Sequence, residues 1–130
     1  AGVYNNILDS YYSDISKAKS TMPIMENDMI SIIILPNELW SRRVIGVYSN
    51  LLMHCDKNRA HALMILINNE SYLVGVRAPY NNKVGADILC SMFGGGGRKG
   101  AAGINNLPKQ DKNNFIKEFK KKFDTSYTYT

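Results

Sequence analysis

Residues 94–103 read GGGGRKGAAG, a stretch in which four glycines are followed directly by two cations and then by small residues. Glycines let successive backbone N–H groups point into one concavity that favours anions, and arginine adds a planar fork for two phosphate oxygens. A solvated turn is the alternative, but ordering four glycines is costly in conformational entropy. The stretch therefore predicts a phosphate-binding loop formed by Gly94, Gly95, Gly96, Gly97, Arg98 and Lys99.

The segments on either side of the glycines decide which phosphate-binding fold is present. Residues 95–100 satisfy the string GxGxxG, but a Rossmann loop follows a strand and opens a helix. Here residues 84–92 predict a helix before the glycines, and residues 101–107 predict a strand after them. A P-loop needs lysine directly after its last glycine, where this chain has Ala101. Neither fold fits, so we expect an anion nest between a helix and a strand.

The rest of the chain alternates between helical and extended patterns. Apolar residues at helical spacing predict helices over residues 3–19, 42–55 and 108–123. Runs rich in β-branched residues predict strands over residues 29–35, 62–67 and 72–78, the last two as a hairpin. We expect an α/β fold in a single domain, with a mixed β-sheet of about four to five strands flanked by helices.

Several single residues carry expectations of their own. Glycine inside a helix costs about 0.5–1 kcal/mol relative to alanine, so Gly46 is expected to let another backbone pack close. Trp40 is expected to close the core rather than to stack a base. For Ser49 two alternatives remain, a position that faces the binding site and an inert position on the helix. Cys55 and Cys90 lie in apolar stretches and are expected to be buried free thiols in a reducing compartment.

The positive charge is concentrated in the half of the chain that carries the glycines. Residues 1–70 hold six Lys/Arg against seven Asp/Glu, a net of −1, and residues 71–130 hold ten against four, a net of +6. A basic balance favours polyanionic partners. The lysines of segment 108–123 are expected to form a solvated face rather than a polyanion track.

The chain has no targeting or membrane signal that we recognise. No apolar run approaches the roughly 18 residues of a membrane span, and no signal peptide is present, so we expect a cytoplasmic protein with no membrane partner. The chain opens on Ala1 and not on methionine, which suggests either a processed chain or a piece cut from something longer.

The stretch GGGGRKGAAG resembles the glycine-rich signature of DHH-family phosphoesterases, usually GGGH or GGGGH, a short gap, then A-A/S-G. VIGVYSNLL (44–52) is similar to the family's helix, and YLVGVRAP (72–79) to its strand that ends in an arginine, here Arg77. From about Ile30 to Phe123 the order and spacing follow the DHH-associated domain, the C-terminal substrate-binding domain of these enzymes. The resemblance implies a connection from a catalytic domain over 1–22, the DHH-associated domain over 23–124 and a loose tail over 125–130.

This resemblance implies a function for the site. Arg77 and the glycine loop would hold a nucleotide, a short RNA or DNA, or another phosphate-bearing ligand such as polyphosphate, over a manganese centre in the missing N-terminal catalytic domain. The chain lacks the DHH triplet, so the resemblance implies no catalytic residue, cofactor or metal in this chain. The isolated chain is therefore expected to be inactive. The spacing of His54, Cys55, Asp56 and His61 matches no standard metal site.

One position departs from the family pattern, and two alternatives remain. Arg98 stands where the family often has histidine, and arginine supplies charge and bidentate hydrogen bonds but no proton near neutral pH. The first alternative is an RNA-binding domain like the C-terminal part of alanyl-tRNA synthetase, which GGGGR also suits. The second is a dimerisation module acting as a homodimer, because edge strands of small sheets pair readily.

Overall fold

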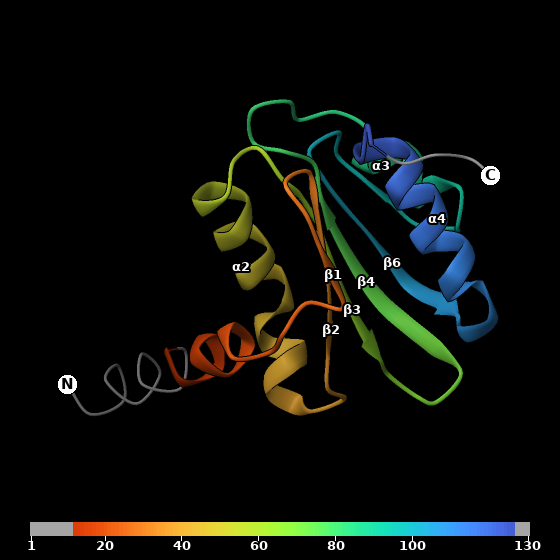
Figure 1. The fold of residues 1–130 in the computed structure, drawn as a ribbon. Helices are drawn as coiled ribbons and strands as arrows, with labels where there is room; N and C mark the ends of the chain where they lie inside the picture. Colours follow the sequence, from red (N-terminus) through yellow and green to blue (C-terminus); the bar gives the residue numbers. More distant parts are fainter. Residues whose placement is uncertain (1–11, 127–130) are drawn as a thin grey trace.

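A mixed sheet forms the centre of the fold, with the strand order β1-β2-β3-β4-β6-β5 (Figure 1). The computed structural model describes residues 12–126. Only β2 and β3 run parallel, and the other neighbours among the described strands are antiparallel. The strands are β1 (Met25–Glu26), β2 (Ile30–Leu35), β3 (Ala60–Leu66), β4 (Ser71–Arg77), β5 (Gly96–Gly97) and β6 (Ala101–Pro108).

The predicted α/β class is confirmed, and the sheet has six strands within the described residues instead of about four to five. The two additional strands are β1 and β5 at the edges, each two residues long. Two residues are too few to show the alternation by which a strand is recognised in a sequence.

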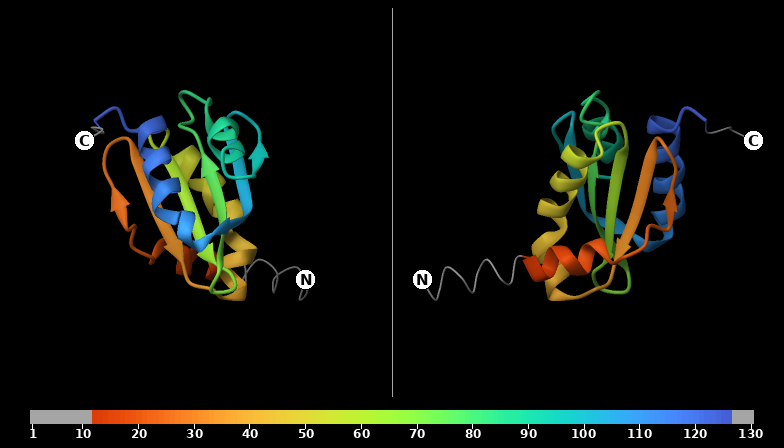
Figure 2. Two further views of the ribbon diagram at one scale, coloured as in Figure 1. Left: turned by 90° about the vertical axis from the view of Figure 1, so that its right-hand side faces the viewer. Right: turned by 60° about the vertical axis from the view of Figure 1, so that its left-hand side comes forward.

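Helices cover the two faces of the sheet unequally (Figures 1 and 2). Helix α2 (Leu39–Cys55) lies on one face and connects the parallel strands β2 and β3, whereas α3 (Ala86–Ser91) and α4 (Lys112–Phe123) lie on the other. A 3₁₀ turn over Lys109–Asp111 precedes α4, so the last helix begins four residues later than predicted. Residues 12–19 are helical, and the Asp14 carboxylate accepts hydrogen bonds from Arg43 of α2.

Each face of the sheet has its own apolar core. On the α4 side, Phe115 and Phe119 are fully buried against the inward residues of β4 and β6. On the α2 side, Trp40, Val44 and Tyr48 pack on β2 and β3. Trp40 is only 8% exposed, which confirms its expected place in the core.

Part of the α2 face of the sheet is not covered by α2, and the sheet carries small residues there. Side chains of β4 alternate, so that Val74 and Val76 face α4 while Gly75 and Arg77 face α2. In register with them, Gly103 pairs with Gly75 and Ala101 with Arg77. The floor beside α2 is therefore nearly bare backbone, and this is where the groove described below lies.

Two expectations about single residues are wrong. A Cβ placed on Gly46 would meet no atom within 4 Å, so this glycine faces open space and does not admit a neighbouring backbone. Cys55 is exposed because it ends α2 beside a polar loop, whereas Cys90 on α3 is buried as expected. Burial raises the pKa of the Cys90 thiol to about 12, which leaves it protonated and unreactive at neutral pH.

Parts of the predicted chain organisation fall outside the described residues. The helix predicted over 3–19 is confirmed for residues 12–19, and residues 1–11 and 127–130 lie outside the described range. The division into 1–22, 23–124 and 125–130 stays a prediction. Between residues 12 and 126, no helix has the length and apolarity needed to cross a membrane.

Candidate phosphate-binding groove

The glycine-rich stretch connects the end of α3 to a tight β-hairpin. Gly96 and Gly97 pair with Gly103 and Ala102, and the Arg98 N–H donates to the Ala101 carbonyl at 2.8 Å. The order helix, loop, strand is as predicted and excludes the Rossmann and P-loop arrangements.

Much of the backbone of this loop is already hydrogen-bonded. The N–H groups of Gly94 and Gly95 donate to the Ser91 and Cys90 carbonyls at 3.3 and 2.9 Å, which satisfies acceptors at the end of α3. The expected nest of free N–H groups therefore does not include Gly94, Gly95 or Arg98. Charge for an anion has to come mainly from side chains.

Three of the four glycines are required by the backbone itself. Gly94 and Gly97 have φ values of +81° and +147°, which side-chain-bearing residues rarely adopt. A Cβ on Gly95 would lie 2.2 Å from the Gly103 carbonyl oxygen. Gly96 differs from the other three, because it has no positive φ and a Cβ there would meet nothing within 4 Å.

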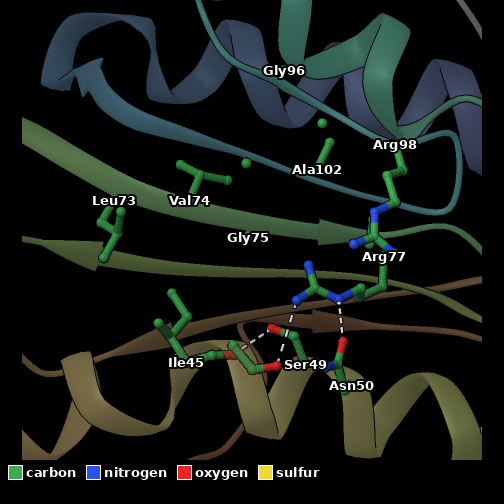
Figure 3. Close-up of a pocket in the computed structure, with 14 residues that line it drawn as sticks. Ile45, Ser49, Asn50, Leu73, Val74, Gly75, Arg77, Gly96, Arg98 and Ala102 are labelled. Carbon is green, nitrogen blue, oxygen red and sulfur yellow. Dashed lines mark hydrogen bonds between the residues drawn. The ribbon is translucent and has the colours of Figure 1, made fainter.

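A groove of about 470 Å³ lies between α2, β4 and the hairpin (Figure 3). Ile45 and Leu73 lie at one end of it, and Arg77 and Arg98 at the other. Gly46 and Gly96, which both lie beside open space, line it from α2 and from β5. The lining residues are Ile45, Gly46, Ser49, Asn50, Leu73, Val74, Gly75, Arg77, Gly96, Gly97, Arg98, Ala101, Ala102 and Gly103, with no carboxylate among them.

Arg77 is held in a fixed orientation at the cationic end. Its Nε donates to Asn50 Oδ1 at 2.8 Å, and its terminal nitrogens donate to the Val76 and Gly46 carbonyls at 3.0 and 3.4 Å. Burial of the side chain lowers the pKa of Arg77, but an arginine remains charged at neutral pH. A guanidinium has five N–H donors, so this group retains hydrogen-bonding capacity for a ligand.

Arg98 approaches the same end of the groove from the hairpin. Its exposed side chain points toward Arg77 in Figure 3. No hydrogen bond or ion pair of the Arg98 side chain is present within residues 12–126, and Arg77 likewise has no acidic partner there. Two converging guanidinium groups without a counter-charge repel one another, and a bound anion would relieve this repulsion.

The structure places the remaining predicted site residues around the groove and not in it. Gly94 and Gly95 line a neighbouring polar groove with Asn105 and Asn106. Lys99 lies at the tip of the hairpin, where its carbonyl accepts from the Ala86 N–H at 2.9 Å, and it lines neither groove. Arg77, Gly96, Gly97 and Arg98 are thus the predicted residues that the fold brings together.

From the sequence, Ser49 was the one residue of the helical wall considered as facing the groove, and Gly46 and Asn50 were not. Gly46 and Asn50 are four residues apart and so lie on one side of α2, where both contact Arg77. A glycine inside a predicted helix, one turn before an asparagine, is the sequence signal that could have identified this wall. Ser49 does line the groove, but it is buried and its hydroxyl donates to the Ile45 carbonyl at 2.6 Å, so its hydrogen-bonding is internal to the helix.

Neither the histidines nor the lysines of α4 add to the groove. In the described part of the chain, no three His, Cys, Asp or Glu side chains are grouped so that they could hold a metal ion. Helix α4 lies on the opposite face of the sheet from α2, so its lysines do not extend the groove (Figure 2).

His61 is a buried histidine of β3, paired with Arg77 of β4, and it gives the fold a pH dependence. It is 1% exposed, its Nδ1 has no hydrogen-bond partner, and its Nε2 lies 3.3 Å from the Asp56 carbonyl oxygen. Burial is the main reason why the pKa of His61 lies below the ordinary histidine value of about 6.5. The neutral imidazole is therefore the form that the folded chain accommodates.

We expect the free energy of unfolding to fall as the pH drops below about 6.5. The unfolded chain then takes up a proton that folded His61 resists, so protonation favours unfolding. Denaturant melts between about pH 7.5 and pH 5 should show this loss, and His61→Gln should remove it. His54→Gln is the matched control, because His54 is exposed, and it should keep the loss. Asp14 and Asp124, whose pKa values are lowered chiefly by hydrogen bonds from Arg43 and Ser126, act in a more acidic range.

Comparison with known proteins shows that the fold of this chain is shared with solved structures. No family model matches the sequence, and no curated protein matches it. Among solved structures, an exopolyphosphatase-related protein from Bacteroides fragilis is similar with a TM-score of 0.60 and 14% identity, over 86% of this chain and 33% of that one. This chain therefore shares its fold with the matching part of that protein. The domain is also similar to the pGpG-specific phosphodiesterase PggH from Vibrio cholerae, with a TM-score of 0.58 and 9% identity, over 88% of this chain and 40% of that one.

At these identities the likeness concerns the fold alone. The fold that the resemblance implied is thereby confirmed. The domain spans well under half the length of both proteins.

Proposed function

We propose that this chain is the substrate-binding domain of a DHH-family phosphoesterase and that its groove holds the phosphate of a nucleotide or short oligonucleotide. The observation that carries the proposal is the convergence of Arg77 and Arg98 on a groove without a carboxylate. Arginine is the side chain best suited to phosphate, because its planar fork donates two parallel hydrogen bonds.

The apolar end of the groove favours a nucleotide over a polyphosphate. Ile45 and Leu73 offer apolar surface at the end of the groove opposite the two arginines, and a base or sugar has a matching face. A polyphosphate chain has no apolar group to place there. Gly46 and Gly96 leave the walls without side chains, so a flat ring can approach the backbone closely.

Hydrolysis itself is proposed to occur on another domain. The chain spans 33% of the exopolyphosphatase-related protein and 40% of the pGpG-specific phosphodiesterase. We propose that a catalytic domain with manganese completes the enzyme and that this chain presents the substrate to it. On its own the chain is then a binding module without hydrolytic activity.

The test is a titration with a mononucleotide such as AMP or pAp. Arg98→Ala should weaken binding by about tenfold or more, because one charge-assisted hydrogen-bonding group is lost. Arg42→Ala removes the same charge at the other end of α2, where Arg42 bonds Asn37 and the Ile67 carbonyl, and should leave the affinity unchanged.

Two results would contradict the proposal. Equal binding by the wild type and Arg98→Ala would show that the groove is not the binding site. Binding of tRNA with no response to any mononucleotide would instead favour the RNA-binding alternative.

A further inference from the structure

A second cationic cluster surrounds Tyr80, outside the groove. The ammonium nitrogens of Lys83 and Lys57 lie 4.0 and 5.2 Å from the centroid of the Tyr80 ring. The ring of His54, at the end of α2, lies 5.1 Å from the same ring, tilted by 53°. Two stretches of the chain, residues 54–57 and 80–83, therefore meet at one aromatic side chain.

Backbone and side-chain hydrogen bonds hold these segments together. The Asn81 N–H donates to the Lys57 carbonyl at 3.2 Å, and the Asn81 side-chain amide donates to Asn58 Oδ1 at 2.5 Å. His54 Nδ1 lies 2.8 Å from the Asn50 carbonyl oxygen. The loop after β4 is thus tied to the loop before β3, and the two lysines are carried by anchored backbone.

The cluster is positive and has no internal counter-charge. Among residues 12–126, no ion pair involves Lys57 or Lys83, and the neighbouring Asp56 pairs with Arg59. The ring of Tyr80 attracts both ammonium groups, but two like charges at one ring also repel each other. An anion placed between the two lysines would turn this repulsion into attraction.

The cluster continues the cationic end of the groove. Asn50 accepts from Arg77 through its side chain and meets His54 through its carbonyl, so it belongs to both sites. At the tip of the hairpin, a Cβ on Gly100 would lie 3.1 Å from Lys83 Cβ. Tyr80 follows Arg77 by three residues, which places their Cα atoms within about 11 Å.

We propose that Lys57 and Lys83 form a second phosphate subsite for a single-stranded oligonucleotide whose neighbouring phosphate occupies the groove. Tyr80 is a positioning residue that gathers the two ammonium groups. The inference rests on the proposed function of the groove and adds a second binding site, so that a chain of at least two nucleotides is bound more tightly than a mononucleotide.

The test compares fluorescently labelled AMP with a labelled single-stranded tetranucleotide by anisotropy, over a series of NaCl concentrations. Lys57→Ala/Lys83→Ala should weaken tetranucleotide binding about tenfold and leave AMP binding unchanged. The slope of log K against log salt should fall in magnitude by about 0.7, because the variant loses one phosphate contact on a single strand. Lys109→Ala/Lys117→Ala removes the same charge beyond the groove, from exposed residues at and before α4, and should leave the slope unchanged.

The outcomes separate this proposal from the one on which it rests. If the wild type binds neither ligand, the groove proposal itself fails. If it binds both ligands and the Lys57/Lys83 variant retains the slope of the Lys109/Lys117 control, the second subsite is overturned and the groove stands. A wild type that binds AMP and the tetranucleotide equally well would also overturn it. Lys57→Gln/Lys83→Gln keeps the side-chain length, and its agreement with the alanine pair would exclude a folding defect.

Discussion

Gly95→Ala is expected to lower the free energy of unfolding by about 3 kcal/mol, whereas Gly96→Ala, one residue later, should change it by less than about 0.5 kcal/mol. The added methyl at position 95 would lie 2.2 Å from the Gly103 carbonyl oxygen and 2.8 Å from a carbon of Ile104. Gly103 is paired with Gly75 inside the sheet, so its carbonyl cannot retreat without opening the ladder between β4 and β6. At Gly96 the same methyl meets nothing within 4 Å.

Urea titration followed by fluorescence measures this difference, because Trp40 is the single tryptophan and is buried in the core. Gly97→Ala should resemble Gly95→Ala, since its Cβ would lie 2.6 Å from Ala102 Cα and its φ is +147°. Equal tolerance of alanine at positions 95 and 96 would show that the loop does not pack on β6 as described.

The glycine run shows what a sequence pattern can and cannot specify. Its entropy cost predicted that the glycines serve a purpose, and the order of its flanks excluded two known phosphate loops. The purpose of Gly95 and Gly97, however, is close contact with β6, and Gly94 allows the chain to leave α3 with a positive φ. Such contacts depend on which strand the loop meets in space, and a run of identical residues without side chains has no alternation that reveals a strand.

The arginines of the site were predictable for a different reason. Arg98 directly follows the glycines, and Arg77 matches the arginine that ends the family's strand; the fold brings both to one groove. The helical wall was not predictable in the same way. An amphipathic pattern tells which residues of α2 leave the core, but the position of the helix over β3 and β4 decides which of those residues face the groove.

Substitutions at Gly46 can test the stability of the fold and ligand binding in the groove separately. It lies within the 17-residue helix α2, where glycine lowers stability by about 0.5–1 kcal/mol relative to alanine, and no atom approaches the position of its absent side chain. Its carbonyl accepts from Arg77, a contact that any residue at this position would retain. Gly46→Ala is therefore expected to raise the free energy of unfolding by about 0.5–1 kcal/mol, measurable in the same urea titration.

Gly46→Leu is expected to weaken mononucleotide binding by tenfold or more while the protein remains at least as stable as the wild type. The leucine side chain would extend into the groove between the apolar end and the two arginines, and it removes neither charge. Loss of affinity would then reflect occupied space, in contrast to the loss of charge in Arg98→Ala. Gly46→Ala provides the graded control, because a single methyl fills little of a groove of about 470 Å³ and should reduce binding much less. Unchanged binding by Gly46→Leu would place the ligand somewhere other than between α2 and the hairpin, since no nucleotide fits there beside a leucine without displacing it.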